Sequence, residues 1–127
     1  MENFSGLTPE EKARLLDLEK SVELDKARPK IKKDFLSFVK YVWPEFIEGS
    51  HHKKINKKFN DLASGKIKRL IINMPPRHTK SEFASYLLPA WMVGLDPRLK
   101  IIQATHTADL AIDFGPKTKN LVDQPNY

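Results

Sequence analysis

The spacing of the apolar residues changes near Leu70, and this change decides which fold class the sequence predicts. Before it, apolar residues recur every three or four positions, which is the period of amphipathic helices. From Leu70 to Met74 they form a short, nearly continuous run, which is typical of a strand covered on both faces in a parallel sheet. A second strand is predicted from Leu99 to Thr105. The sequence therefore predicts an α/β fold, with a helical N-terminal segment followed by the first two strand–helix units of an incomplete parallel sheet.

The first helix is predicted from its starting residues. Thr8 is placed to cap the helix, Pro9 suits the first helical position, and Glu11 can reach back to the backbone of the cap. The helix is expected to run to about Ala27, where Pro29 interrupts it. Its apolar stripe is narrow and lies among many charges, so we expect it to lie on the surface or to project from the body.

Two further helices are predicted before Leu70. One is expected to end before Pro44, and its apolar face consists of Ile31, Phe35, Phe38, Val39 and Val42. The other is expected to begin with Ser50 as its cap and to end at Gly65. Its apolar stripe consists of Ile55, Phe59 and Leu62.

Two helices are also predicted after Met74. The first should begin near Lys80, bend at Pro89 and end within residues 94–97. Its apolar residues are Phe83, Ala84, Leu87, Leu88 and Trp91. The last is expected over residues 108–122, and the Gly115-Pro116 pair should kink or split it.

The composition narrows the classes of function. The chain has 22 Lys and Arg residues against 16 Asp and Glu, a formal charge of +6, which favours polyanionic partners such as DNA or nucleotides. There are no cysteines, so a disulfide framework and a cysteine-based zinc site are excluded. No stretch approaches the roughly 18 apolar residues of a membrane-spanning helix, and we expect neither secretion nor membrane insertion.

The segment from Met74 to Ser81, MPPRHTKS, joins the first predicted strand to the next helix. A phosphate-binding loop at such a place needs backbone N–H groups at a helix N-terminus, an ammonium group for the phosphates and a hydroxyl for Mg²⁺. Lys80 and Ser81 supply the ammonium and the hydroxyl. The general pattern has glycine at the positions of Met74 and Thr79, and a β-branched Thr79 tolerates positive φ poorly. The alternative is that Pro75-Pro76 ends a strand and Thr79 caps an ordinary helix.

The wider sequence carries a family resemblance. Residues 74–82, MPPRHTKSE, resemble the variant Walker A loop of tailed-phage terminase large subunits, in which the first glycine is commonly absent. Similar segments flank the loop in the right order: FLSFVKYVWP followed by His51-His52, LLPAWMVG, QATHTADLAIDFG and residues 120–127. The resemblance implies an N-terminal helix and linker over residues 1–29 and part of a P-loop ATPase domain over residues 30–127. Thr79 departs from the family pattern, and so does Pro116, where a basic residue is usual.

This resemblance implies ATP and Mg²⁺ as cofactors. Lys80 is expected to be the catalytic phosphate lysine, and Arg77 is expected to stabilise charge that develops on the γ-phosphoryl group. A surface arginine that contacts DNA or a neighbouring subunit is the alternative for Arg77. Ser81 is the expected Mg²⁺ ligand. The residues expected to contact the nucleotide are Pro76, Arg77, His78, Thr79, Lys80, Ser81, Glu82 and His52. Either Phe46 or His52 is expected near the base, and the alternative for His51 and His52 is a helix start with solvated imidazoles.

Three other sets of polar residues each have both a functional and a purely structural interpretation. His51 and His52 diverge by about 100° on a helix, so they are not expected to share a metal ion. Residues 105–107, Thr-His-Thr, follow the second predicted strand at the edge where such sheets collect functional groups, but a polar loop in which Thr107 caps the last helix is the plainer reading. The lysine-rich segments 26–33, 53–58 and 66–69 are expected to be solvated faces, with DNA contact as the alternative.

The resemblance implies a motor that moves viral DNA into the procapsid and cleaves it. Its implied partners are double-stranded DNA, the terminase small subunit, the portal and other copies in a homo-oligomeric ring, in the host cytoplasm. The chain carries no acidic strand end of the Walker B type and no nuclease domain, and it stops within terminase-like sequence, so we expect it to be catalytically incomplete alone. Two alternatives stay open: another P-loop enzyme such as a helicase, and a non-enzymatic basic DNA-binding or adaptor domain.

Overall fold

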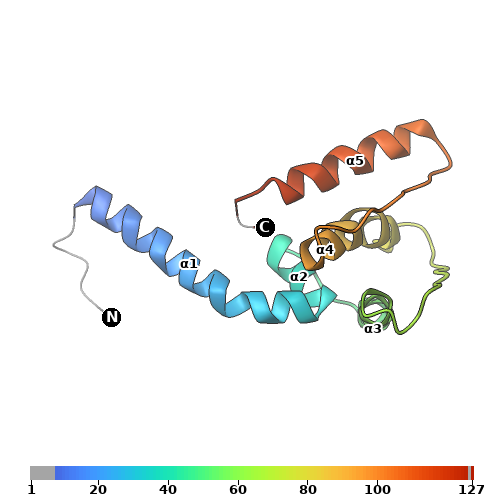
Figure 1. Ribbon diagram of the computed structural model, residues 1–127, viewed down its shortest axis with the longest axis horizontal. Helices are drawn as coiled ribbons and strands as arrows, with labels where there is room; N and C mark the ends of the chain where they lie inside the picture. Colours follow the sequence, from blue (N-terminus) through green and yellow to red (C-terminus); the bar gives the residue numbers. More distant parts are fainter. Residues whose placement is uncertain (1–7, 126) are drawn as a thin grey trace.

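A computed structural model describes residues 8–125 and 127, which are predominantly helical (Figure 1). In chain order the elements are α1 (Pro9–Lys33), α2 (Phe35–Val42), α3 (Ser50–Ala63), the π-helical segment η1 (Glu82–Leu87), α4 (Leu88–Leu95) and α5 (Ala108–Val122). Residues 1–7 and 126 lie outside the described residues. The beginning of the predicted N-terminal segment and one residue of the terminase-like stretch 120–127 therefore have no structural counterpart here.

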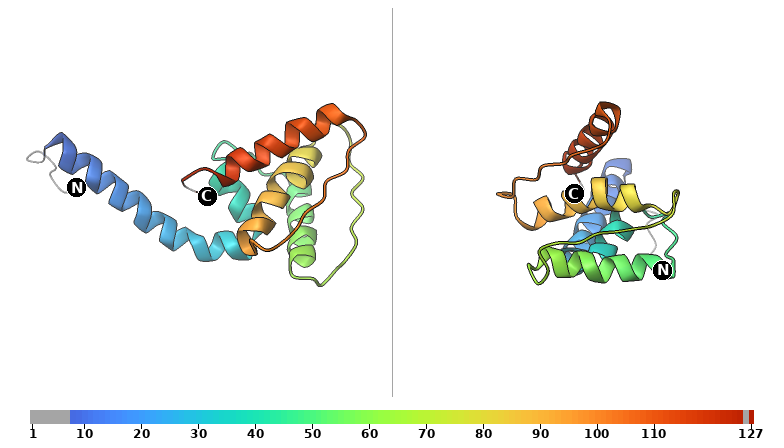
Figure 2. Two further views of the ribbon diagram at one scale, coloured as in Figure 1. Left: turned by 45° about the horizontal axis from the view of Figure 1, so that its top comes forward. Right: turned by 90° about the vertical axis from the view of Figure 1, so that its right-hand side faces the viewer.

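The predicted parallel sheet and the α/β class are wrong, because residues 8–125 and 127 contain no strand. Both predicted strands are loop segments that join helices (Figure 2). In the first of them Leu70, Ile72 and Met74 pack against the core, whereas Ile71 is 87% exposed. In the second, Ile102 is 95% exposed. A continuous apolar run predicted burial on both faces, but the core covers only one face and no neighbouring strand pairs with the backbone.

The core forms around α2, which packs against α1, α3 and α4. Phe35, the first residue of α2, is fully buried, and its ring meets those of Phe59, Phe83 and Trp91 edge to face at 5.0, 5.4 and 5.6 Å. The apolar faces predicted for the second, third and fourth helices supply most of the core, so those predictions are confirmed. The buried cluster consists of Phe35, Leu36, Phe38, Val39, Ile55, Phe59, Phe83, Leu87, Leu88, Ala90, Trp91 and Leu121.

A network of hydrogen bonds joins the start of α2 to α3. Asp34 caps α2 by accepting bonds from the backbone and the hydroxyl of Ser37, at 2.9 and 3.0 Å. Asn56 and Asn60 donate to its other carboxylate oxygen at 2.7 and 2.8 Å, and their carbonyl oxygens accept from the first two backbone N–H groups of α2. Burial raises the pKa of Asp34, but the bonds from Asn56, Asn60 and Ser37 outweigh it and hold the pKa below 3.8.

The Asp34→Ala substitution is expected to lower the free energy of unfolding by about 2–4 kcal/mol, since it removes a helix cap and leaves two asparagine amides without their acceptor. Urea unfolding followed by circular dichroism measures this change. Asp17→Ala, at an exposed position on α1, is the matched control and should change stability by less than about 0.5 kcal/mol. Equal stabilities for the two variants would show that the network does not contribute.

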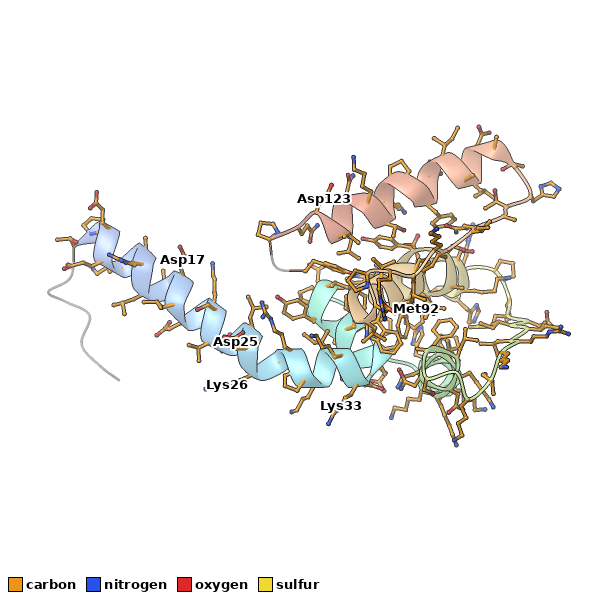
Figure 3. The ribbon with its side chains drawn as sticks, viewed as in Figure 1. Asp17, Asp25, Lys26, Lys33, Met92 and Asp123 are labelled. Atoms are coloured by element: carbon orange, nitrogen blue, oxygen red, sulfur yellow. The ribbon has the colours of Figure 1, made fainter. Side chains whose placement is uncertain are left out.

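The start of α1 is as predicted. Thr8 caps the helix, and Glu11 accepts a bond from the Thr8 backbone N–H at 2.8 Å while its own N–H donates to the Thr8 hydroxyl at 3.3 Å. No residue of α1 is buried. Figure 3 shows the labelled Asp17 on the part of α1 that projects from the helical body.

The predicted end of α1 near Ala27 is wrong, because the helix continues through Pro29 to Lys33. A proline inside a helix removes one backbone hydrogen bond. Here the turn that follows Pro29 is held by contacts of Ile31. Ile31 packs against the core, and its carbonyl accepts a bond from Trp91 Nε1 at 2.7 Å. The residues on both sides of the predicted boundary at 29 therefore belong to one helix.

A helix begins at Lys80, as predicted, and continues through η1 and α4 to Leu95. The backbone N–H of Leu88 donates to the carbonyl of Phe83, five residues back, which gives η1 its wider turn. Pro89 has no backbone N–H to donate within the helix. In the turn before this proline, the carbonyl of Ser85 accepts a bond from the side chain of Gln103, a loop residue, at 3.1 Å.

The last helix, α5, is capped by the Thr107 hydroxyl, which accepts from the N–H of Leu110 at 3.5 Å. Gly115-Pro116 is expected to kink or split this helix, and the split is wrong: α5 runs unbroken from Ala108 to Val122. Its two halves are each anchored by a buried side chain, Phe114 before the proline and Leu121 after it. Within residues 8–125 and 127, no helix combines the length and the apolar character needed to cross a bilayer.

Candidate phosphate-binding loop

The predicted loop residues lie together at the beginning of the helix that starts at Lys80. Five of them are exposed: Pro76, Arg77, His78, Lys80 and Ser81. Thr79 and Glu82 are half-buried. The structure thus presents the ammonium, hydroxyl and guanidinium groups of the predicted site to solvent at one helix end.

The backbone of this loop has an unusual conformation. Arg77 and Thr79 have φ values of 63° and 58°, and they are the residues other than glycine with positive φ among those described. This left-handed region costs a residue with a Cβ atom about 1–2 kcal/mol. Thr79 therefore takes the backbone region that a glycine at this position would supply. Such left-handed turns direct successive backbone N–H groups into a concave anion-binding surface.

The N-terminus of the helix offers further backbone N–H donors. Its first hydrogen bond joins the N–H of Phe83 to the carbonyl of Thr79 at 2.9 Å. The N–H groups of Lys80, Ser81 and Glu82 precede that bond, so they have no partner within the helix. Together with the helix dipole, such N–H groups favour a negative charge placed at the helix end.

The charged side chains of the loop differ in their contacts. Lys80 is exposed and forms no ion pair with any described residue. Glu82 accepts a bond from the ammonium group of Lys117 on α5, at 3.3 Å. Lys80 is therefore available to a ligand, whereas Glu82 faces α5.

His52 lies in the first turn of α3, where its ring contacts the loop at Thr79. It is 5% exposed, and its Nδ1 accepts a bond from the backbone N–H of Gly49 at 2.8 Å. Since that nitrogen is an acceptor, the neutral ring carries its hydrogen on Nε2, which lies 2.8 Å from the hydroxyl oxygen of Thr79. Thr79 in turn donates its hydroxyl hydrogen to the carbonyl of His78 at 2.6 Å. The hydrogen bonds therefore run in one direction, from the Gly49 N–H through the His52 ring and the Thr79 hydroxyl to the carbonyl of His78.

Burial lowers the pKa of His52 below its ordinary value of 6.5, and the nearby His51 and His78 lower it further against an opposing effect of Glu48. The unfolded chain therefore binds more protons than the folded one as the pH falls below 6.5. The stabilisation from neutral His52 is complete above 6.5 and is lost as the pH falls from there through the folded pKa.

We expect the stability difference between the natural chain and the His52→Asn variant to shrink as the pH falls below 6.5. Asparagine keeps an acceptor for the Gly49 N–H but does not titrate. Urea unfolding of both proteins across this pH range measures the difference. A difference that is constant with pH would show that His52 does not need to be neutral.

Two other histidines, His51 and His78, lie near His52, and the ring centres of His51 and His52 are 3.8 Å apart. The rings of His51 and His78 lie 5.7 Å apart, and Phe46 packs against His52 at 4.7 Å between ring centres. His52, which the sequence predicts to lie near the nucleotide, contacts the hydroxyl of Thr79. Within the described part of the chain, no three His, Cys, Asp or Glu side chains converge to hold a metal ion.

Residues 105–107 form a polar turn before α5. The hydroxyl of Thr105 donates to the carbonyl of Thr107 at 2.7 Å, and Thr107 caps the helix. His106 is exposed. The plainer reading of these residues is therefore confirmed for Thr107. Their predicted place at the edge of a sheet is wrong, because the described residues form no sheet.

The sequence reasoning missed the link from Gly49 through His52 to Thr79. One signal for it was present: His52 stands three residues after Gly49, which caps α3 in place of the predicted Ser50. From that position a side-chain acceptor can reach back to the cap's N–H. Comparisons of the chain with protein-family models, with curated proteins and with solved structures found no match.

Proposed function

We propose that residues 74–81 bind the triphosphate of ATP, and that the chain is the nucleotide-binding part of a terminase-type motor. The observation that carries the proposal is the φ of 58° at Thr79, directly before the helix that begins with Lys80. Thr79, at the glycine position, is a departure of this loop from the general pattern. Because its backbone takes a glycine-like conformation, this departure is compatible with a phosphate-binding loop.

Each side chain then has a defined task. The ammonium group of Lys80 neutralises charge on the β- and γ-phosphates, and the N–H groups at the helix start hold the phosphate oxygens. The hydroxyl of Ser81 would hold Mg²⁺, which would supply charge neutralisation when bound with the nucleotide. Arg77, exposed on the same loop, would stabilise charge on the γ-phosphoryl group.

The larger role follows from the resemblance to terminase large subunits. In that role the complete motor moves double-stranded DNA into a procapsid, in a ring of identical subunits that contacts the small subunit and the portal, in the host cytoplasm. Hydrolysis needs acidic residues that hold Mg²⁺ and orient the attacking water. The loop offers Glu82 alone, and Lys117 is bonded to it. We therefore expect this chain to bind ATP without turning it over.

Titration of the full chain with a fluorescent ATP analogue in the presence of Mg²⁺ tests the proposal. Saturable binding that unlabelled ATP displaces is the expected result. Tripolyphosphate should also displace the analogue, because the loop recognises phosphates. An analogue that fails to bind saturably, or that tripolyphosphate at high concentration cannot displace, contradicts the assignment of the loop.

A second candidate function is non-enzymatic binding of DNA. It is favoured by one observation: four exposed lysines on α3, which are Lys53, Lys54, Lys57 and Lys58. Binding through these groups would weaken steeply with salt and would not depend on Lys80. DNA affinity measured at two salt concentrations, for the natural chain and for Lys80→Ala, separates this candidate from the ATP proposal.

A further inference from the structure

The conformation of Thr79 is unfavourable for a β-branched residue, so its surroundings must hold it in place. Its hydroxyl is fixed at two points, since it lies 2.8 Å from His52 Nε2 and donates to the carbonyl of His78 at 2.6 Å. Its own carbonyl accepts from the N–H of Phe83 at 2.9 Å. Thr79 is thus held through both its side chain and its backbone.

His52 is itself fixed. The backbone N–H of Gly49 binds one ring nitrogen, and the rings of Phe46 and Phe83 lie 4.7 and 5.1 Å from the imidazole, measured between ring centres. Phe83 is fully buried, and His52 is 5% exposed. A donor held this firmly can fix the position of the hydroxyl that it contacts.

We infer that His52 is a positioning residue of the loop: by donating from Nε2 to the Thr79 hydroxyl, it holds Thr79 in the left-handed conformation that this position otherwise needs a glycine to adopt. The consequence for nucleotide affinity rests on the proposed function, whereas the effect on loop conformation does not. His52 acts through Thr79 and is not expected to touch the nucleotide itself.

The inference predicts that His52 and Thr79 depend on each other. Asparagine at position 52 keeps an acceptor for Gly49 but is too short to reach Thr79, whereas glutamine can place an amide donor where Nε2 lies. Glycine at position 79 adopts positive φ without help. The loss of the loop conformation caused by His52→Asn should therefore be large when residue 79 is threonine and small when it is glycine.

Exchange of the Phe83 amide hydrogen with deuterated solvent, followed by NMR on the full chain, tests this without any nucleotide. In the natural background His52→Asn should speed the exchange about tenfold, and His52→Gln should restore much of the protection. In the Thr79→Gly background His52→Asn should change it by less than about threefold. Equal acceleration in both backgrounds, or none in either, overturns the inference.

Variants at position 79 test the same hydrogen bond and leave the buried His52 unchanged, so they avoid misfolding caused by a substitution at His52. Thr79→Ser keeps the hydroxyl and Thr79→Ala removes it, and residue 79 is only half-buried. Serine should preserve the exchange rate of the Phe83 amide within about threefold, and alanine should raise it about tenfold. Indistinguishable serine and alanine variants also overturn the inference.

Affinity for the fluorescent ATP analogue with Mg²⁺ gives a separate readout on the same proteins. It should weaken about tenfold for His52→Asn beside Thr79, and less than about threefold beside glycine. If the natural chain binds no analogue while the amide exchange follows the predicted pattern, the proposed function fails and the positioning by His52 stands. If the analogue binds, but neither the amide exchange nor the affinity depends on the combination of residues at positions 52 and 79, the proposed function stands and the positioning by His52 fails.

Discussion

Lys80→Ala is expected to weaken binding of the ATP analogue about ten- to hundredfold, because it removes a charge-assisted bond to the phosphates. Lys80 is exposed and forms no ion pair with a described residue, so the substitution should leave the fold intact. The loss of a positive charge at a helix N-terminus should even stabilise the chain slightly. Fluorescence titration gives the affinity, and circular dichroism shows that the variant is folded.

The matched control for this prediction is Lys57→Ala on α3, which removes the same charge from another exposed position. It should change the affinity by less than about threefold, since a solvent-exposed charge outside the loop acts through a screened field. If both variants weaken binding equally, the nucleotide is held by the general positive charge of the chain and not by the loop.

Phe35→Ala is expected to lower the free energy of unfolding by about 3–5 kcal/mol, because it leaves a cavity where three aromatic rings meet. Phe35 is fully buried against Phe59, Phe83 and Trp91, so its loss loosens α3 and the helix after the loop together. A domain of this size is typically stable by about 5–15 kcal/mol, so the loss is a large part of the total. Urea unfolding followed by circular dichroism measures it.

Ile47→Ala is the control for the core prediction. Ile47 is 88% exposed, so its truncation should change stability by less than about 0.5 kcal/mol. A Phe35→Ala variant that unfolds at the same urea concentration as the natural chain would contradict the placement of the core around α2.

The helices could be predicted from the sequence because their signals are local. Thr8, Pro9 and Glu11 fix the start of α1, and the three- and four-residue spacing of apolar side chains marks the buried faces of α2 and α3. The end of α1 could not be predicted in this way. It depends on contacts that Ile31 makes with the core and with Trp91, sixty positions along the chain.

The two strands were wrongly predicted, because an apolar run in the sequence does not by itself specify a strand. An apolar run such as Leu70 to Met74 shows that a segment is in contact with a core, but a strand also needs a partner with which its backbone can pair. In the described chain these residues contact the core along one side, and no such partner is present. The residues of the run therefore pack as a loop.

The candidate site could be predicted in part. The resemblance picked out Lys80 and Ser81, and the structure places both at the start of a helix, exposed. It could not reveal how Thr79 is accommodated, because the answer lies in His52, whose ring reaches the hydroxyl from a different helix. Nothing in the spacing of these two residues along the sequence indicates that they touch.

We propose that the loop from Met74 to Ser81 binds a triphosphate, and NMR titration of the ¹⁵N-labelled chain with Mg-ATP shows whether it does. We predict that the largest shifts occur at the amides of His78, Thr79, Lys80 and Ser81, saturate together, and are reproduced in large part by tripolyphosphate. Shifts that fall instead on the lysines of α3, or amides of the loop that do not move at saturating nucleotide, would contradict the claim.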